Sequence, residues 1–444
     1  MSVQLKFSPI YRWWKNWFIL LLSFLTSFSV VACQQPSDPS LKPDKIASYN
    51  KPGIVLVHAQ HQADISYPEP VLDSEKFQQL QAEVAQRLSN GKISSKAEAV
   101  TLFIKEVLGN PVQYMRPGST REEQVKVPSF GTGFIITDDG TVATAAHVVS
   151  HENESMKRKI AQTALVNTTR EYCKKGIREL ASDDRVREAL SQTTNPRELL
   201  AICESGFEKY YAEHLRIGRV STDTNVVLPS TNPGQTNTPK VMSSEIKKTG
   251  QSVPGQDVAL LKMSGQNFPI VTLSDDIEPS TGGSVYSLGY PGDITKMFIN
   301  QDRRDLPEPS LTAGIISAVK RPAEGGEVLQ ANIAISPGNS GGPLLDSRGE
   351  AIGLASFVAL NDKEQQVEGA GFFVPIKTLK QLLQAAGITP QESKLMRRYH
   401  RGIDFLQRKQ FGQALKEFEE VRNLNPDFPY IQQLIAKSQA APNK

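Results

Sequence analysis

The chain begins with a basic segment followed by an apolar one. Lys6, Arg12 and Lys15 precede an apolar run over residues 18–32, and this stretch holds no acidic residue. A positive segment, a short apolar segment and a small residue form the pattern of a secretory signal. The run is shorter than the ~20 residues that span a bilayer. We therefore expect residues 1–32 to be a signal peptide, with an uncleaved signal anchor as the alternative.

Three segments of the chain lack the short apolar runs that predict strands. Residues 33–50 are polar and proline-containing, which predicts a flexible linker. In residues 73–108, apolar residues recur every three or four positions, as at Phe77, Leu80, Val84 and Leu88. Residues 152–215 are highly charged and have few β-branched runs. Residues 73–108 and 152–215 are therefore predicted to be helical insertions in a chain that otherwise favours strands.

The region between residues 51 and 390 is dominated by short apolar runs separated by Gly, Pro, Asp or Asn. Clear examples are residues 54–58, 258–261, 285–288 and 352–358. Many short strands with turn signals predict an antiparallel barrel or sandwich. Helical spacing returns near residue 376, and we expect residues 395–440 to form a separate helical unit.

Composition narrows the function classes. The 444 residues are 39% hydrophobic and 22% charged, with a formal net charge of +3. A chain of this composition is globular rather than disordered. It carries no strong basic field, so a nucleic-acid partner is not expected. The three cysteines cluster neither with each other nor with histidines, so no metal site is expected.

The clearest chemical motif is the glycine-rich stretch 338–343, which places Ser340 between glycines. A serine nucleophile needs an exposed hydroxyl and nearby backbone N–H groups, and flanking glycines permit the required backbone. The same letters satisfy G-x-S-x-G, the nucleophile elbow of α/β-hydrolases, but that fold needs a helix directly after the serine. Pro343 and two leucines follow instead. A plain glycine-rich turn is the bland alternative.

A base for this serine must come from upstream. The chain has six histidines, and His147 follows the small residues Ala145 and Ala146 just after a predicted β-hairpin. Asp257 begins an apolar strand and could accept the Nδ1–H of His147. The alternatives are a structural histidine and an aspartate in an ordinary turn.

Together these stretches resemble the trypsin-like (chymotrypsin-fold) serine peptidases, in their HtrA/Deg-like bacterial branch. The matching segments are residues 131–136, 144–147, 257–261, 287–291, 312–317, 336–344 and 371–375. They follow the family's order of His, Asp and Ser. The resemblance implies a mainly β fold of two six-stranded antiparallel β-barrels, here with helical insertions and a C-terminal α-helical hairpin.

The resemblance also implies a role for each matched residue. Ser340 would be the nucleophile, His147 the general base and then acid, and Asp257 its orienter. The N–H groups of Gly338 and Ser340 would form the oxyanion hole. Ala334 would lie at the base of the specificity pocket, and the lack of a carboxylate there favours small or aliphatic side chains before the scissile bond. No cofactor is expected.

Export from the cytoplasm would suggest a role for each of the three cysteines. Residues 30–33 resemble the lipobox of bacterial lipoproteins, which implies that Cys33 is lipidated and anchors the protein to a membrane, facing the periplasm or cell exterior. In an oxidising compartment, Cys173 and Cys203 are a candidate disulfide. Two buried thiols that merely pack are the alternative.

The C-terminal helices have a resemblance of their own. Residues 395–428 resemble a single tetratricopeptide repeat, with Gly402, Ala414 and Phe418 at signature positions. One repeat cannot bury its faces alone, so it should dock on the protease, self-associate or bind a protein partner. A generic helical hairpin is the alternative.

The sequence therefore predicts a serine endopeptidase that acts on extracytoplasmic proteins or peptides. Family resemblance adds protein quality control and a homo-oligomer as expectations. The rival hypothesis is a catalytically silent scaffold that binds peptides or partners through the protease and repeat regions.

Signal removal has a spectroscopic consequence. All three tryptophans, Trp13, Trp14 and Trp17, lie in the predicted signal peptide. Purified mature protein should therefore show tyrosine fluorescence only. A tryptophan emission band in membrane-extracted protein would contradict cleavage before Cys33.

Overall fold

The computed structural model describes residues 40–230, 240–252, 254–275, 279–292, 308–323, 325–360, 366–391 and 393–440, without the side chains of residues 358–360 and 366–369. The predicted signal peptide and Cys33 lie outside these ranges. From Leu41 onward, the described residues belong to one compact unit. Within the described ranges, no helix combines the length and the apolarity that crossing a bilayer requires.

Six antiparallel strands close into a first barrel in the order β1-β2-β3-β6-β5-β4. The strands are β1 (Ile54–Leu72), β2 (Met115–Ile135), β3 (Thr141–Thr144), β4 (Arg216–Leu228), β5 (Lys240–Thr249) and β6 (Ala259–Met263). The turn between β2 and β3 ends on Gly140, whose φ of 96° favours glycine. The buried apolar runs of β3 and β6 pair directly, with Thr144 opposite Ala259. This pairing sets the position of the residues that follow β3 and precede β6.

A second antiparallel sheet has the strand order β10-β11-β12-β9-β8-β7. Its strands are β7 (Ser284–Gly289), β8 (Ser310–Lys320), β9 (Val328–Ala331), β10 (Pro343–Leu345), β11 (Ala351–Leu360) and β12 (Gln366–Pro375). A short ladder between β10 and β7, with Leu344 opposite Ser287, returns the order to its start. The expectation of a mainly β, antiparallel fold with a six-stranded barrel is therefore confirmed.

Two sequence predictions need correction. Residues 43–50, expected to belong to a flexible linker, form helix α2 (Pro43–Asn50), followed by the 3₁₀ turn η1 (Lys51–Gly53). Pro43 suits the first helical turn, and the apolar side chain of Ile46 is fully buried in the main core. The strand predicted over residues 54–58 continues to Leu72.

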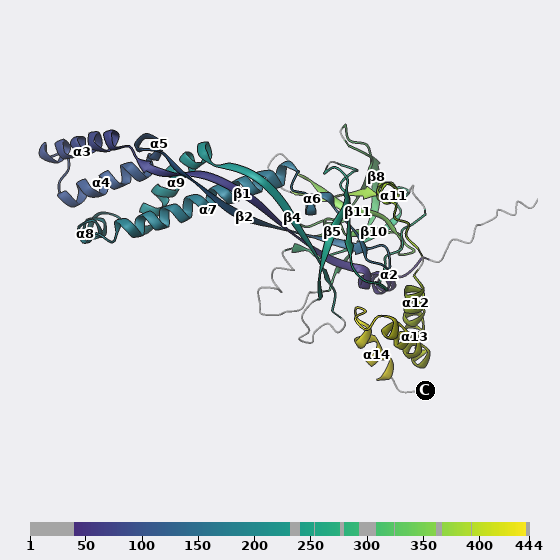
Figure 1. The fold of residues 1–444 in the computed structure, drawn as a ribbon. Helices are drawn as coiled ribbons and strands as arrows, with labels where there is room; N and C mark the ends of the chain where they lie inside the picture. Colours follow the sequence, from purple (N-terminus) through teal and green to yellow (C-terminus); the bar gives the residue numbers. More distant parts are fainter. Residues whose placement is uncertain are drawn as a thin grey trace, which may run out of the picture. The chain divides into compact units, whose positions relative to one another are not determined.

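The extra length of β1 builds an elongated projection. Past the barrel, β1 pairs with β2 as far as Leu72 and with β4 as far as Ser66, so three strands leave the barrel together. Six helices pack around them: α3 (Ser74–Ser89), α4 (Lys96–Gly109), α5 (Pro111–Tyr114), α7 (Glu154–Leu180), α8 (Asp184–Thr193) and α9 (Pro196–His214). We call residues 61–127 and 154–222 the arm, which lies on the left of Figure 1. Five of these helices fall, to within a residue, in the two segments predicted as insertions, whereas α5 lies just after the first of them.

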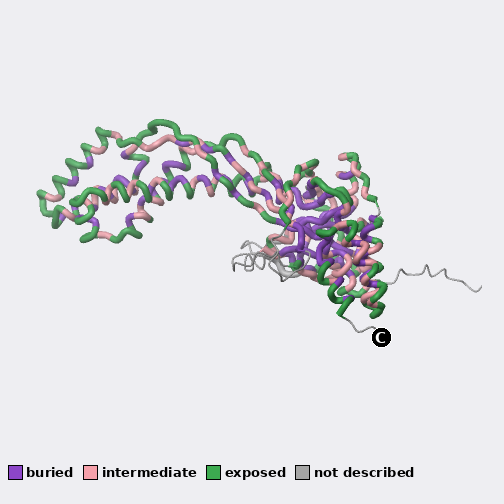
Figure 2. Tube along the Cα trace, turned by 60° about the horizontal axis from the view of Figure 1, so that its bottom comes forward, coloured by how far each residue is buried: buried purple, intermediate pink, exposed green. Residues whose placement is uncertain are grey.

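The arm has hydrophobic clusters separate from the main core. One cluster includes Phe207 and Tyr211 of α9, and another joins α3 to α4 through Leu80 and Ile93. Figure 2 shows that buried residues concentrate in the region of the first barrel and the second sheet, and are sparser in the arm. The predicted disulfide between Cys173 and Cys203 is present and joins α7 to α9.

The C-terminal helices pack on the barrel region. Helix α11 (Ile376–Ala385) is followed by α12 (Lys394–Gln407), α13 (Phe411–Leu424) and α14 (Ile431–Gln439). Gly402 allows α12 to approach α13, because a Cβ there would lie 2.5 Å from the Phe418 ring. Tyr399 Oη donates to the carbonyl of Ser48 in α2 at 2.8 Å. These helices therefore share the main core with the barrels.

The disulfide should stabilise the arm. Cys173 and Cys203 are 30 residues apart, and for a loop of that length chain entropy predicts about 3–4 kcal/mol of stabilisation. The double substitution Cys173→Ala/Cys203→Ala should lower the free energy of unfolding of the helical arm by that amount, measured by far-UV circular dichroism in urea. Gln192→Ala, on the exposed face of α8, is the control. A loss no larger than the control's would contradict the prediction.

Candidate active site

His147 and Asp257 meet although 110 residues separate them. His147 lies in the short helix α6 (Ala146–Val149), directly after β3, and Asp257 lies just before β6. Because β3 pairs with β6, the two residues come together at the same end of the ladder. His147 Nδ1 lies 2.6 Å from Asp257 Oδ2, and the backbone N–H of His147 donates to Oδ1 at 2.8 Å. Both carboxylate oxygens thus hold the histidine in place.

Ser356 is a further partner that sequence reasoning missed. Its hydroxyl donates to Asp257 Oδ2 at 2.6 Å. The only sequence signal was a lone polar side chain in the apolar run 352–358. Asp257 therefore accepts three hydrogen bonds while its side chain is only 5% exposed. A buried carboxylate with this many donors stays ionised.

His147 and Asp257 each shift the pKa of the other. Burial by itself lowers the pKa of His147, but the negative charge of Asp257 and its hydrogen bond outweigh that effect and leave the pKa raised above 6.5. Burial raises the pKa of Asp257, and the charge of His147 together with the donors from His147 and Ser356 more than reverses this, so the pKa lies below its ordinary value. The arrangement therefore favours an imidazolium beside a carboxylate.

The loop that carries Ser340 depends on its glycines. Gly338 and Gly341 have φ of 99° and 89°, in the region that favours glycine. A Cβ on Gly341 would lie 2.2 Å from the carbonyl oxygen of Thr132. Thr132, at the barrel end of β2, also donates its hydroxyl to the Gly338 carbonyl and its N–H to the Ser340 carbonyl. A residue of the first barrel thus fixes the loop that leads into β10 of the second sheet.

Ser340 lies next to the His147–Asp257 pair but is not hydrogen-bonded to it. Its Oγ donates to the backbone carbonyl of Ser356 at 3.4 Å, and among the described residues no hydrogen bond joins Ser340 Oγ to His147. Ser356 therefore contacts both parts, through its hydroxyl on Asp257 and its carbonyl on Ser340. The structure brings the three predicted residues into one neighbourhood.

Two backbone donors near Ser340 are available. In the described part of the chain, the N–H groups of Asn339, Gly341 and Gly342 donate to backbone carbonyls, whereas those of Gly338 and Ser340 have no acceptor. Unpaired N–H groups beside a serine hydroxyl can stabilise a negative oxygen. This is the arrangement expected of an oxyanion hole.

The other predicted site residues are not part of this hydrogen-bonded group. Ala334 is exposed on the loop after β9, between the buried Ile333 and Ile335. The Cys173–Cys203 disulfide belongs to the arm rather than to this site. Among the described residues, no group of three or more His, Cys, Asp or Glu side chains is placed to hold a metal ion. The chain continues from Ser340 into strand β10 rather than a helix, which excludes the α/β-hydrolase elbow.

Removing the carboxylate of Asp257 should reverse the shift in the pKa of His147. In Asp257→Asn the burial of the imidazole remains while the opposite charge is lost, so its pKa should fall from above 6.5 to below it. An NMR titration of the imidazole, assigned by the signal missing in His147→Gln, measures this. Asp64→Asn on the exposed arm should leave the signal unchanged. A pKa that stays above 6.5 in Asp257→Asn would show that Asp257 is not the cause.

Comparisons with known proteins find similar sequences among bacterial serine proteases. A probable periplasmic serine endoprotease DegP-like of Pseudomonas putida (strain GB-1) is 35% identical over 127 residues, covering 28% of this chain and 23% of its own. The serine protease Do-like HtrB of Bacillus subtilis (strain 168) is 32% identical over 162 residues, covering 34% and 31%. The chain thus spans a quarter to a third of the length of these relatives.

A solved structure and a family profile complete the comparison. The structure of an HtrA-type protease, AlgW with decapeptide, has a TM-score of 0.38 at 16% identity and covers 78% of this chain and 67% of its own. The profile of the trypsin-like peptidase domain matches residues 131–354, which include His147, Asp257 and Ser340. Because this match covers just over half of the 444 residues, the chain belongs to the trypsin-like peptidase family.

Proposed function

We propose that this protein is a serine endopeptidase that hydrolyses peptide bonds of extracytoplasmic proteins through an acyl-enzyme on Ser340. The observation that carries the proposal is the hydrogen-bonded group of His147, Asp257 and Ser356 beside Ser340, with two unpaired N–H groups at hand. Such a group supplies a nucleophile, a base and an oxyanion site together. Relatives described as a probable serine endoprotease and a serine protease add support.

The proposed reaction starts with a rotation of the nucleophile. Ser340 Oγ turns from the Ser356 carbonyl toward His147 Nε2, which takes its proton as Oγ attacks the substrate carbonyl carbon. Asp257 stabilises the imidazolium, because its carboxylate already accepts the Nδ1–H. The N–H groups of Gly338 and Ser340 receive the oxyanion, and losing one such donor typically costs about 10²–10³ in rate.

The imidazolium then gives its proton to the leaving amine, and the acyl group stays on Ser340. A water molecule, deprotonated by His147, attacks the acyl carbon. The imidazolium then returns this proton to Ser340 Oγ as the bond between Oγ and the acyl carbon breaks and the carboxylic acid product leaves. Ser356 takes part only as a positioning residue, since it fixes Asp257. We propose that the second sheet serves as the second barrel of the chymotrypsin-like pair, because its strand order returns to its start.

Several finer features belong to the same proposal. The exposed Ala334 suits a pocket for small or aliphatic side chains before the scissile bond. We infer an exported protein held at a membrane by lipid on Cys33, which the lipobox-like residues 30–33 support. The helices over residues 395–440 would act as a tetratricopeptide-like unit docked on the protease. Protein quality control and homo-oligomer formation are further expectations of the family.

One observation favours a second candidate function. Ser340 Oγ is hydrogen-bonded to the Ser356 carbonyl and not to the base. A serine that keeps this partner would be a poor nucleophile, and the domain would then serve as a scaffold that holds peptides or protein partners.

A serine-directed phosphonate probe separates the two functions. The wild-type protein should be labelled covalently, and Ser340→Ala should lose labelling together with about 10⁶ in the rate of peptide hydrolysis. Labelling is measured by mass spectrometry and hydrolysis with a peptide library, which also reports the residue before the cut. Ser182→Ala, in the exposed loop after α7, is the matched control. Absence of labelling in folded wild-type protein would favour the scaffold function. Cleavage only after Lys or Arg would overturn the proposed preference for small or aliphatic side chains before the scissile bond.

A further inference from the structure

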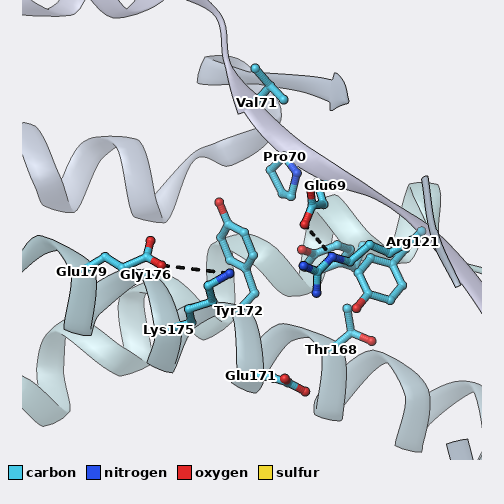
Figure 3. Close-up of a pocket in the computed structure, with 12 residues that line it drawn as sticks. Glu69, Pro70, Val71, Arg121, Thr168, Glu171, Tyr172, Lys175, Gly176 and Glu179 are labelled. Carbon is cyan, nitrogen blue, oxygen red and sulfur yellow. Dashed lines mark ion pairs between the residues drawn. The ribbon is translucent and has the colours of Figure 1, made fainter. Parts of the chain in front are cut away.

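The arm contains a cavity of about 240 Å³, far from any residue of the proposed reaction. It lies between the outer end of β1, Arg121 of β2, helix α7 and one residue of α9 (Figure 3). Its lining residues are Tyr67, Glu69, Pro70, Val71, Arg121, Thr168, Glu171, Tyr172, Lys175, Gly176, Glu179 and Tyr211. The volume is somewhat below the ~300–1,000 Å³ of drug-sized ligand pockets, so it suits a single side chain or a small molecule.

Two backbone features keep this cavity open. The pairing of β1 and β2 shifts register between Pro68 and Pro70, which forms a β-bulge opposite Glu69. Gly118 allows the close approach there, because a Cβ would lie 2.4 Å from Val71 Cγ2. Gly176 lies inside α7, where glycine costs about 0.5–1 kcal/mol relative to alanine. A Cβ on Gly176 would meet nothing within 4 Å, so packing does not require the glycine.

The cavity is rich in aromatic surface and contains an unpaired hydroxyl. The Tyr67 and Tyr211 rings meet edge to face at 5.4 Å, and Tyr172 lies 6.1 Å from Tyr211. Tyr211 is fully buried, and its hydroxyl has no hydrogen-bond partner among the described residues. Burying a hydroxyl without a partner is unfavourable, so a ligand that bonds to it would be favoured. Burial raises the pKa of Tyr211, so this hydroxyl keeps its proton.

The charges around the cavity leave carboxylates available. Arg121 is already engaged, with Nε 2.5 Å from Glu69 and a second contact to Glu123 at 3.8 Å. Lys175 and Glu179 are only loosely paired at 4.0 Å, as the dashed line in Figure 3 marks. Among the described residues, Glu171 has no ion-pair partner. The lining therefore carries three acids against two bases, and one base is fully occupied.

Aromatic faces and available carboxylates together attract a cation. An ammonium or guanidinium group on an alkyl stem would match both, since the stem packs on the rings and the charge reaches Glu171 and Glu179. We propose that the arm cavity binds such a group, as carried by a lysine or arginine residue of a polypeptide or by a small diamine. This binding site goes beyond the proposed peptidase reaction and does not depend on it.

Titration calorimetry on the full chain carrying Ser340→Ala tests the proposal without cleavage of the ligand. The probes are Nα-acetyl-lysine methylamide, the same compound made from norleucine, and cadaverine. The lysine compound should bind and the neutral norleucine compound should bind at least tenfold more weakly. Cadaverine binding alone would assign the site to a free diamine, and preference for the lysine compound would assign it to polypeptide.

Variants locate the binding within the arm. The double substitution Glu171→Gln/Glu179→Gln and the cavity-filling Gly176→Met should each weaken binding about tenfold. Tyr211→Phe should weaken binding without lowering the melting temperature, because its hydroxyl makes no hydrogen bond in the unliganded protein. Glu208→Gln, an exposed acid of α9 outside the cavity, is the matched control.

Several outcomes would overturn the proposal. These are no heat of binding for either cation, equal binding of the norleucine compound, or equal binding by the control and the double variant. Circular dichroism checks that each variant is folded. If Gly176→Met does not fold, the double Gln variant decides the result, since both of its sites are exposed.

Discussion

The buried carboxylate of Asp257 is the interaction on which the site depends. A charge with so little exposed surface would be very unfavourable unless donors surrounded it, and three donors do so. Two come from His147 at the end of β3, and the third comes from Ser356 in β11 of the second sheet. Satisfying one carboxylate therefore requires both sheets to meet at this point, which ties folding to assembly of the site.

The contact between the two sheets is reinforced around the nucleophile. Thr132 of the first barrel binds the backbone on both sides of Asn339, and its own backbone limits the space at Gly341. Gly341 is thus required by crowding against the first barrel, whereas a Cβ on Gly338 would lie 2.4 Å from the carbonyl oxygen of Tyr290. Among the described residues, the N–H groups of Gly338 and Ser340 have no acceptor. A rigid loop with unpaired donors is what electrostatic stabilisation of an oxyanion needs.

The helical insertions do not disturb the site around Asp257 and Ser340, because they extend strands rather than interrupt them. β1, β2 and β4 keep their barrel pairing and simply continue outward, where α5, α7 and α9 of the arm pack on them. The arm consequently has its own hydrophobic clusters and its own disulfide. Its cavity can differ in chemistry from the proposed active site, since the two share neither lining residues nor core.

The sequence by itself predicted the strand-rich class and the helical segments, because apolar spacing is local. Its motifs, read through a family resemblance, pointed to His147, Asp257 and Ser340 as candidate site residues. It missed α2, since this short polar helix is held by contacts with distant segments, such as the burial of Ile46 in the main core and the hydrogen bond from Tyr399 to Ser48. It also missed Ser356, whose role arises from a contact 99 residues away in the chain. Only the tertiary structure decided the hydroxyl direction of Ser340 and the unpaired hydroxyl of Tyr211, because a hydrogen-bond partner is set by packing between distant segments.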